Sequence, residues 1–352
     1  MLQITWQTHV GKRMIEEKKL VIYGASVSAQ SKEDSFWQRL KNWQYEQAKN
    51  KSEFWSIERL TYPSAFMSDA ALLNLDHVIA MNPDIVVLDW LSTEEQNCSF
   101  EKIYHIYEEL CGRGIEVITL AAVRLDTWDV VTLQYELCLK LSKFLKQSFL
   151  DIKVLAEQKG LSWKELTRDG VHTSEVGAEI ISEAIIQELY ERGIGNTNYI
   201  CREVSDSAFA VPQIRQTISH FEIGKEVRLE DKQHLKLKLH KNAGKSAQVW
   251  CLQTVGPYTP KVKCSIEGQV NEITLFDQWC KFERFAFKPL TPELSSDSAG
   301  EFEVLLSLTE SVLDEFLLKQ KIAESSYCKG VMLRIHDRIS LVNCTLKGWE
   351  VV

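Results

Sequence analysis

The sequence lacks the patterns that mark several common functional classes. No stretch approaches the run of about 18 apolar residues that a membrane-spanning helix requires, so we expect no membrane span. The net charge is −8, and no basic cluster with interleaved aromatic residues occurs. This excludes nucleic acid and anionic membrane surfaces as the main partner. The segment GASVSA does not match G-x-G-x-x-G, which disfavours a nucleotide-binding Rossmann domain.

Patterns typical of metal sites and disulfide frameworks are missing as well. The nine cysteines include no C-x-x-C pair, and the eight histidines include no H-x-x-x-H or H-E-x-x-H pattern. An odd number of irregularly spaced cysteines argues against a disulfide framework and against zinc. Residues 1–19 contain no apolar core of a secretory signal. We therefore expect reduced cysteines, no metal and a cytoplasmic location.

The chain is long enough for two medium-sized domains, with 352 residues of which 45% are hydrophobic. Up to about residue 198, short apolar runs alternate with helical patterns. The runs VIY, IVVLDW and IEVITL are nearly continuous, as in parallel strands covered on both faces. This alternation predicts an α/β sandwich with a parallel sheet. The predicted strands are 20–23, 54–57, 85–89, 115–120 and a weaker 161–166, and the predicted helices are 68–81, 101–113, 126–159 with a break near 148–151, and 174–192.

From residue 199 onward the pattern is that of an all-β domain. Residues 235–240 alternate strictly between apolar and polar, and Gly and Pro separate several further runs. We predict a β-sandwich accessory domain over 199–352, with one helical segment at 311–323 and with carbohydrate binding as one interpretation. Its further strands are predicted at 249–254, 262–266, 272–276, 282–287, 302–308 and 331–335. The aromatic residues that would either stack on sugar rings or pack in the core are Trp250, Tyr258, Trp279 and Trp349.

An apolar strand at the start of the first domain ends on a serine. In LVIYGASVS, residues 20–28, the strand runs into Gly24 and Ser26 follows it. Glycine tolerates tight backbone angles and serine caps helices, so an ordinary strand-to-helix turn is one interpretation. The other is a nucleophile held at the end of a strand.

A second motif, RDGVHTSEVGAEIIS at residues 168–182, places Asp169 three residues before His172 and just ahead of a helix that Thr173 or Ser174 can cap. This spacing lets the carboxylate bind the near ring nitrogen and leaves the far nitrogen free as a base. A serine needs such a base to act as a nucleophile. Because ligand sites form at the carboxyl ends of parallel strands, we expect Ser26, Asp169 and His172 at one edge. In the alternative interpretation, Asp169 caps a turn and His172 is a surface or packing residue.

With these motifs the chain resembles the SGNH (GDSL-type) hydrolases over about residues 18–192. VIYGASVS is similar to the first block of that family, DGVHTSEVGAEIISEAI to its last block, and NPDIVVLDW to the strand that leads into its third block. The resemblance implies a three-layer α/β/α domain over 1–198. It also implies a Ser26 nucleophile, a His172 base and an Asp169 that orients the base. The implied reaction is acyl-ester hydrolysis, or acyl transfer to another hydroxyl.

The chain departs from this family at the groups that would bind the oxyanion. Thr93 stands where the family has an asparagine, the second block lacks its glycine near Ala65, and Ala25 replaces the aspartate of G-D-S. Backbone N–H groups do not depend on the side chain, so those of Ser26 and Ala65 are candidate donors, with the Thr93 hydroxyl as a third. Losing one donor costs about two to three orders of magnitude in rate, so a slow or silent site is the alternative.

Three further residues are candidates for binding substrate. Asp89 and Trp90 end the third strand and could grip a sugar, although a strand-end tryptophan also serves to complete a core. Arg124 follows the fourth strand and could bind a carboxylate or phosphate, or it could be a solvated loop residue.

Together these features predict a cytoplasmic serine enzyme that removes O-acyl groups, O-acetyl above all, from a carbohydrate, a polysaccharide or an acylated small molecule. Hydrolysis through an acyl-enzyme on Ser26 requires no cofactor. One alternative is an O-acetyltransferase with acetyl-CoA as the donor, since water exclusion decides between the two outcomes. The other is a catalytically silent, SGNH-like glycan-binding protein.

Overall fold

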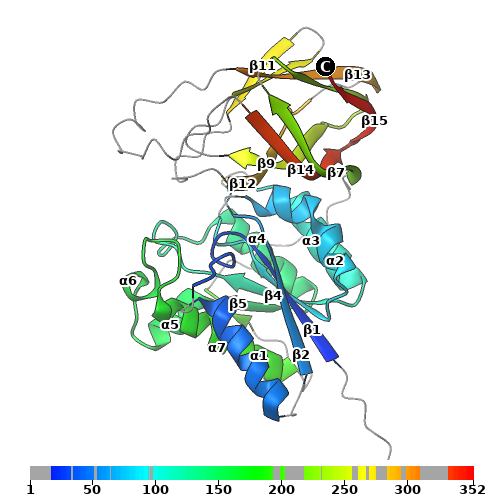
Figure 1. The fold of residues 1–352 in the computed structure, drawn as a ribbon. Coiled ribbons are helices and arrows are strands. Elements are labelled where there is room, and N and C mark those ends of the chain that lie inside the picture. Colours follow the sequence, from blue (N-terminus) through cyan, green and yellow to red (C-terminus); the bar gives the residue numbers. More distant parts are fainter. Residues whose placement is uncertain are drawn as a thin grey trace, which may run out of the picture.

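The computed structural model places an α/β domain beside a β-sandwich, with the β-sandwich above the α/β domain in Figure 1. The structure describes residues 17–32, 35–50, 54–63, 65–93, 95, 98–192, 199–202, 218–230, 232–255, 261–266, 269–274, 284–294, 299–309 and 332–352. No helix among these residues is both long and apolar enough to cross a membrane.

The α/β domain is built on one parallel sheet of six strands in the order β2-β1-β3-β4-β5-β6. Strand β3 is buried along its whole length, as expected of a central strand with the sequence IVVLD. All carboxyl ends of a parallel sheet lie at one edge, and loops that leave this edge can form a shared site. The strands are β1 (Glu17–Gly24), β2 (Phe54–Thr61), β3 (Ile85–Asp89), β4 (Glu116–Ala121), β5 (Ser148–Asp151) and β6 (Tyr199–Ile200).

Helices cover both faces of this sheet. One apolar cluster joins the sheet to α2, α3 and α4, and a second joins the opposite face to α1, α5 and α7. Several helices begin at side chains that accept a backbone N–H, such as Ser99 before α3 and Thr132 before α4. The helices are α1 (Phe36–Asn50), the π-helix η1 (Met67–Ala71), α2 (Leu75–Ala80), α3 (Phe100–Gly112), α4 (Leu133–Phe144), α5 (Ile152–Gln158), α6 (Trp163–Leu166) and α7 (Glu175–Arg192). The predicted three-layer α/β/α architecture is therefore confirmed.

Two predictions within this domain need correction, and two of its elements were not predicted. The break expected near 148–151 is the buried strand β5, and the strand expected at 161–166 contains the short helix α6. Helix α1 was not predicted. Strand β6 lies beyond the predicted boundary at residue 198, yet it pairs with β5 in the first sheet.

Two antiparallel sheets face each other in the second part of the chain, so the predicted β-sandwich is confirmed. The sheets have the orders β11-β10-β13-β8-β15 and β12-β9-β14-β7, and their inner side chains form a separate apolar core. The strands are β7 (Ile218–Glu230), β8 (His234–Lys241), β9 (Gln248–Val255), β10 (Lys261–Ile266), β11 (Gln269–Thr274), β12 (Arg284–Pro289), β13 (Gly300–Thr309), β14 (Met332–Val342) and β15 (Cys344–Val351). The edge strands β7 and β15 were not predicted, and the helix expected at 311–323 lies outside the described residues.

The two domains contact each other through a charged pair and an aromatic cluster. Arg338 of β14 binds Asp76 of α2 with both terminal nitrogens, at 2.5 and 2.8 Å, and donates to the Leu73 carbonyl at 2.9 Å. Beside this pair, Phe287 packs edge-on against Tyr62 and stacks on Trp250. The contact therefore joins a buried arginine of the second domain to a half-exposed aspartate of the first, beside a buried aromatic cluster.

Of the four aromatic residues considered as candidates for stacking on sugar rings, Trp250 lies in the interface between the domains rather than on an open surface. Trp349 packs against the core of the sandwich, and Tyr258 and Trp279 lie outside the described residues.

Candidate active site

Ser26 lies in a tight turn that follows β1 and is half-buried. The turn is fixed by backbone hydrogen bonds from Ala25 N to the Asp89 carbonyl and from Ala29 N to the Ala25 carbonyl, both 3.1 Å long. At Gly24, a Cβ atom would lie 2.7 Å from the Asp89 carbonyl and 2.7 Å from the Ser28 hydroxyl. Only glycine fits this position, because any side chain would collide with the end of β3 and with Ser28.

The motif at residues 168–182 forms the expected carboxylate–imidazole pair. His172 Nδ1 lies 2.8 Å from Asp169 Oδ2, and the His172 backbone N–H donates to Asp169 Oδ1 at 2.8 Å. Partial burial raises the pKa of Asp169, but hydrogen bonds from His172 outweigh it and hold the pKa below its ordinary value. Asp169 is therefore ionised at neutral pH and holds the ring with Nε2 directed away from it.

The loop that carries this pair is held from both ends. Thr167 and Thr173 form an isolated antiparallel bridge that closes it, and Leu125 N donates to the Gly170 carbonyl at 2.7 Å. Helix α7 then begins, capped by Ser174, whose hydroxyl accepts from Gly177 N at 3.1 Å. The pair is thus built on fixed backbone.

The serine turn and the Asp169–His172 loop meet at the carboxyl edge of the sheet. Gln30, four residues after Ser26, donates from Nε2 to Thr173 Oγ1 at 3.0 Å, directly after His172. Among the described residues no hydrogen bond joins the Ser26 hydroxyl to the His172 ring, so the direct Ser–His contact stays a prediction. Such contacts often form only when substrate is bound.

The three candidate oxyanion donors differ in whether they already donate a hydrogen bond to another group. Thr93 donates from both its backbone N and its hydroxyl to the Trp90 carbonyl, at 3.2 and 3.4 Å. The N–H groups of Ser26 and Ala65 have no backbone partner among the described residues. Ala65 follows Tyr62, whose N–H donates to the Gly24 carbonyl at 2.9 Å. The loop with Ala65 thus lies against the serine turn, which favours the two backbone donors over Thr93.

The prediction that Asp89 and Trp90 grip a substrate is wrong, because both side chains are buried. Trp90 is 1% exposed and packs edge-on against Tyr23, at 5.2 Å between ring centroids. Asp89 is 0% exposed, and its Oδ2 accepts a hydrogen bond from Ser28 Oγ at 2.5 Å. Burial raises the pKa of Asp89 to about 7. Trp90 completes the core, whereas Asp89 lies beneath the serine turn.

Arg124 is neither a free anion-binding group nor a solvated loop residue. Its Nε and Nη2 donate to the two carboxylate oxygens of Asp126, at 2.8 and 2.5 Å, and its Nη1 donates to the Ser92 carbonyl at 2.9 Å. The hydrogen bonds from Arg124 lower the pKa of Asp126 below its ordinary value. Arg124 therefore ties the loop after β4 to the loop after β3.

Sequence reasoning missed two residues that hold the serine turn. Ser28 anchors the turn to Asp89, and Arg59 of β2 donates to the carbonyls of Ser28 and Gln30 at 3.1 and 2.7 Å. Ser28 lies within the quoted motif and was available as a signal. Arg59 has no sequence signal, because its role depends on the pairing of β1 with β2.

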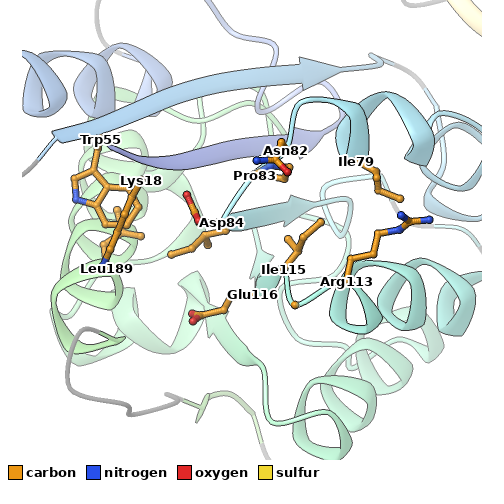
Figure 2. Close-up of a pocket in the computed structure, with 12 residues that line it drawn as sticks. Lys18, Trp55, Ile79, Asn82, Pro83, Asp84, Arg113, Ile115, Glu116 and Leu189 are labelled. Atoms are coloured by element: carbon orange, nitrogen blue, oxygen red, sulfur yellow. The ribbon is translucent and has the colours of Figure 1, made fainter. Parts of the chain in front are cut away.

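Two cavities lie at opposite edges of the sheet. One, of about 460 Å³, borders the amino-terminal ends of β1, β3 and β4, with Lys18, Asp84 and Glu116 among its lining residues, as Figure 2 shows. The other, of about 360 Å³, lies between the domains and is lined by Thr61, Tyr62 and Pro63, by Phe285 and Phe287, and by Arg338. Only the second borders the loop that leads to Ala65.

No protein-family model and no curated protein matches the sequence. Among solved structures, the chain is similar to a two-domain esterase (CEX) active on acetylated mannans, with a TM-score of 0.60 at 11% identity over 92% of this chain and 91% of that one. A structure of that esterase co-crystallised with mannopentaose gives the same TM-score and identity. An acetyl xylan esterase, AlAXEase, covers 48% of this chain at 17% identity with a TM-score of 0.39. The chain therefore has the fold of the SGNH (GDSL-type) hydrolases, followed by a β-sandwich domain.

Proposed function

We propose that the protein is a serine esterase that removes O-acetyl groups from a carbohydrate or polysaccharide. The observation that carries this proposal is the 2.8 Å contact between Asp169 and His172 on a loop that meets the Ser26 turn at the carboxyl edge of the sheet. In the proposed reaction, this loop supplies an oriented base for the hydroxyl at the end of β1.

In this mechanism Ser26 Oγ attacks the acyl carbon while His172 Nε2 takes its proton. The backbone N–H groups of Ser26 and Ala65 bind the oxyanion. His172 then gives the proton to the sugar oxygen, which leaves as an alcohol and an acyl-enzyme remains on Ser26. Water then attacks the acyl carbon while His172 Nε2 takes one of its protons, and the bond to Ser26 Oγ breaks as His172 returns that proton to Oγ, which releases acetate and regenerates Ser26. Asp169 remains ionised throughout and stabilises the charged ring.

The carbohydrate part of the proposal is supported by the cavity between the domains. Tyr62, Phe285 and Phe287 are among the residues that line it, and the cavity borders the loop that leads to Ala65. The likeness to a two-domain esterase active on acetylated mannans agrees with this substrate class. The cytoplasmic location expected from the sequence stays a prediction, and so does the absence of a cofactor.

Acetate release from O-acetylated mannan and xylan and from p-nitrophenyl acetate tests this function. We expect Ser26→Ala to lose activity at least about a thousandfold, because no other group supplies the nucleophile. Ser56→Ala, which removes a serine hydroxyl from strand β2, is the control and keeps wild-type activity. Acetate transfer to a sugar hydroxyl in place of release would instead identify a transferase. Wild-type protein that binds glycans and releases no acetate would identify a silent binding protein.

A further inference from the structure

Asp89 is a buried acid that the proposed mechanism does not use. It ends β3 directly beneath the serine turn and is 0% exposed. Its Oδ2 accepts a hydrogen bond from Ser28 Oγ, whereas its Oδ1 has no partner among the described residues. A buried carboxyl group without full hydrogen bonding costs free energy, which an apolar residue at this position would avoid. Asp89 therefore calls for an explanation other than packing.

The contacts of Asp89 lie on both sides of the candidate nucleophile. Its backbone carbonyl binds the N–H of Ala25, the residue before Ser26, at 3.1 Å. Its carboxyl group binds Ser28, two residues after Ser26, which is itself 0% exposed. The absence of a Cβ at Gly24 lets the turn approach Asp89 this closely. One residue thus fixes the backbone before and after Ser26.

The two arginines near the serine turn do not hydrogen-bond the Asp89 carboxyl group. Arg59 donates to the carbonyls of Ser28 and Gln30, and Arg124 donates to the carbonyl of Ser92, which follows Asp89 in the chain. Ser28 Oγ donates to the Asp89 carboxyl group, whereas the Ser92 hydroxyl donates to the Asp89 backbone carbonyl at 3.4 Å. Raised pKa values of buried acids are common at functional sites, and the pKa of about 7 for Asp89 agrees with such a place.

We propose that Asp89 is a positioning residue for the nucleophile, because its buried carboxyl group holds, through Ser28, the turn that presents Ser26. This inference rests on the proposed function. The acceptor oxygen matters and not the negative charge, since an asparagine oxygen accepts the Ser28 hydroxyl proton equally well. Displacing a reacting group by about 1 Å can cost about a hundredfold in rate.

The test compares kcat and KM for p-nitrophenyl acetate across five proteins and the wild type: Asp89→Ala, Asp89→Asn, Ser28→Ala, the double Ser28→Ala/Asp89→Ala, and Val87→Ala. We expect Asp89→Ala and Ser28→Ala each to lower kcat about 10- to 100-fold with KM within about twofold. The double variant should lose no more than either single one, because both remove the same hydrogen bond. Asp89→Asn should keep kcat within about threefold of wild type.

Val87→Ala is the matched control, because Val87 is equally buried and lies two residues before Asp89 on the same face of β3, farther from the carboxyl end of the strand. It should lower the melting temperature and leave kcat unchanged. If Asp89→Ala fails to fold, Ser28→Ala and Asp89→Asn still give opposite results under the proposal. Wild-type kcat in Ser28→Ala, or a loss in Asp89→Asn equal to that in Ser28→Ala, overturns it.

Hydrogen exchange separates this inference from the proposed function. Peptides that cover residues 24–30 should exchange faster in Ser28→Ala and Asp89→Ala than in wild type, Asp89→Asn or Val87→Ala. An active wild type whose variants keep their kcat and exchange rates contradicts the positioning role alone. A wild type that releases acetate from no ester contradicts the proposed function, and with it any role of Asp89 in positioning a nucleophile.

Discussion

The ionisation of Asp89 couples one side chain to the stability of the protein. Its pKa is about 7 in the folded chain, compared with an ordinary value of 3.8. Between these two pH values the folded protein keeps a proton that the unfolded chain has released. The contribution of Asp89 to the free energy of unfolding therefore falls as the pH rises from about 4 to about 7. Above about pH 7 this contribution no longer changes with pH.

Asp89→Asn removes this titration, so the stability of the variant relative to wild type should increase with pH. At 1.36 kcal/mol for each pKa unit, the gain between pH 4 and pH 8 is up to about 4 kcal/mol. Urea unfolding at the two pH values measures it. Asp129→Asn, which alters a carboxylate on an exposed loop, is the control and should change the difference by less than about 0.5 kcal/mol. A constant difference between Asp89→Asn and wild type would show that Asp89 is already ionised in the folded protein at low pH.

The predicted side-chain contact that the structure contains, between Asp169 and His172, is a local one. Asp169 and His172 are three residues apart, so their pairing follows from the loop itself. The pairing of Arg124 with Asp126 is equally local, but the sequence does not show which of several nearby carboxylates an arginine selects. Burial of Asp89 and Trp90 depends on distant segments packed above them, and a strand-end position does not specify that packing.

Helix α7 illustrates how one contact between elements positions the site. A Cβ at Gly177 would lie 2.1 Å from the Leu166 carbonyl at the end of α6. Ser174 N donates to the same carbonyl at 2.9 Å, and the loop with Asp169 and His172 connects the two helices. The close approach of α6 to α7 therefore fixes where this loop begins and ends.

Gly177→Ala should force the two helices apart and destabilise the protein by more than about 2 kcal/mol, because the clash is with backbone. It should also lower kcat with p-nitrophenyl acetate, since the His172 loop moves. Gly112→Ala in α3 is the matched control. No atom lies within 4 Å of its added Cβ, so it should stabilise by about 0.5–1 kcal/mol. Thermal unfolding measures the stability of both variants relative to wild type. Equal stability of Gly177→Ala and wild type would contradict this account of the helix contact.

The elements that were predicted and those that were missed differ in physical pattern. Strand β3 and helix α7 have a continuous apolar run and a long helical pattern, respectively. Strand β5 has only four residues, with a polar residue at each end, and it lies between two helices. The sequence pattern around it was therefore interpreted as one long helix with a break. Strands β7 and β15 lie at sheet edges, where charged residues interrupt the apolar alternation.

The contact between the domains combines residues that are far apart in the sequence. Arg338 and Asp76 are separated by 262 positions, which is why no sequence pattern predicted their pairing. Partial burial raises the pKa of Asp76, but the hydrogen bonds from Arg338 outweigh it and the pKa lies below its ordinary value. The pair thus stabilises the contact beside the loop that leads to Ala65.

Arg338→Ala should lower the free energy of unfolding by about 1–3 kcal/mol, because it removes the hydrogen bonds of a buried guanidinium group to the half-exposed Asp76 carboxylate and to the Leu73 carbonyl. Calorimetry measures this loss. Arg113→Ala breaks an exposed pair with Glu109 within one helix and serves as the control, with an expected loss below about 0.5 kcal/mol. Equal losses in the two variants would mean that the Arg338 pair does not hold the domains together.

The central claim is that Ser26 is a nucleophile activated by His172, and covalent trapping tests it most directly. The wild type, Ser26→Ala and His172→Ala are incubated with a p-nitrophenyl phosphonate ester, and intact mass and peptide mapping follow the adduct. The account predicts one adduct on Ser26 of the wild type, none in Ser26→Ala, and labelling slowed at least about a hundredfold in His172→Ala. A folded wild type that remains unlabelled, or that carries its adduct on another residue, would contradict it.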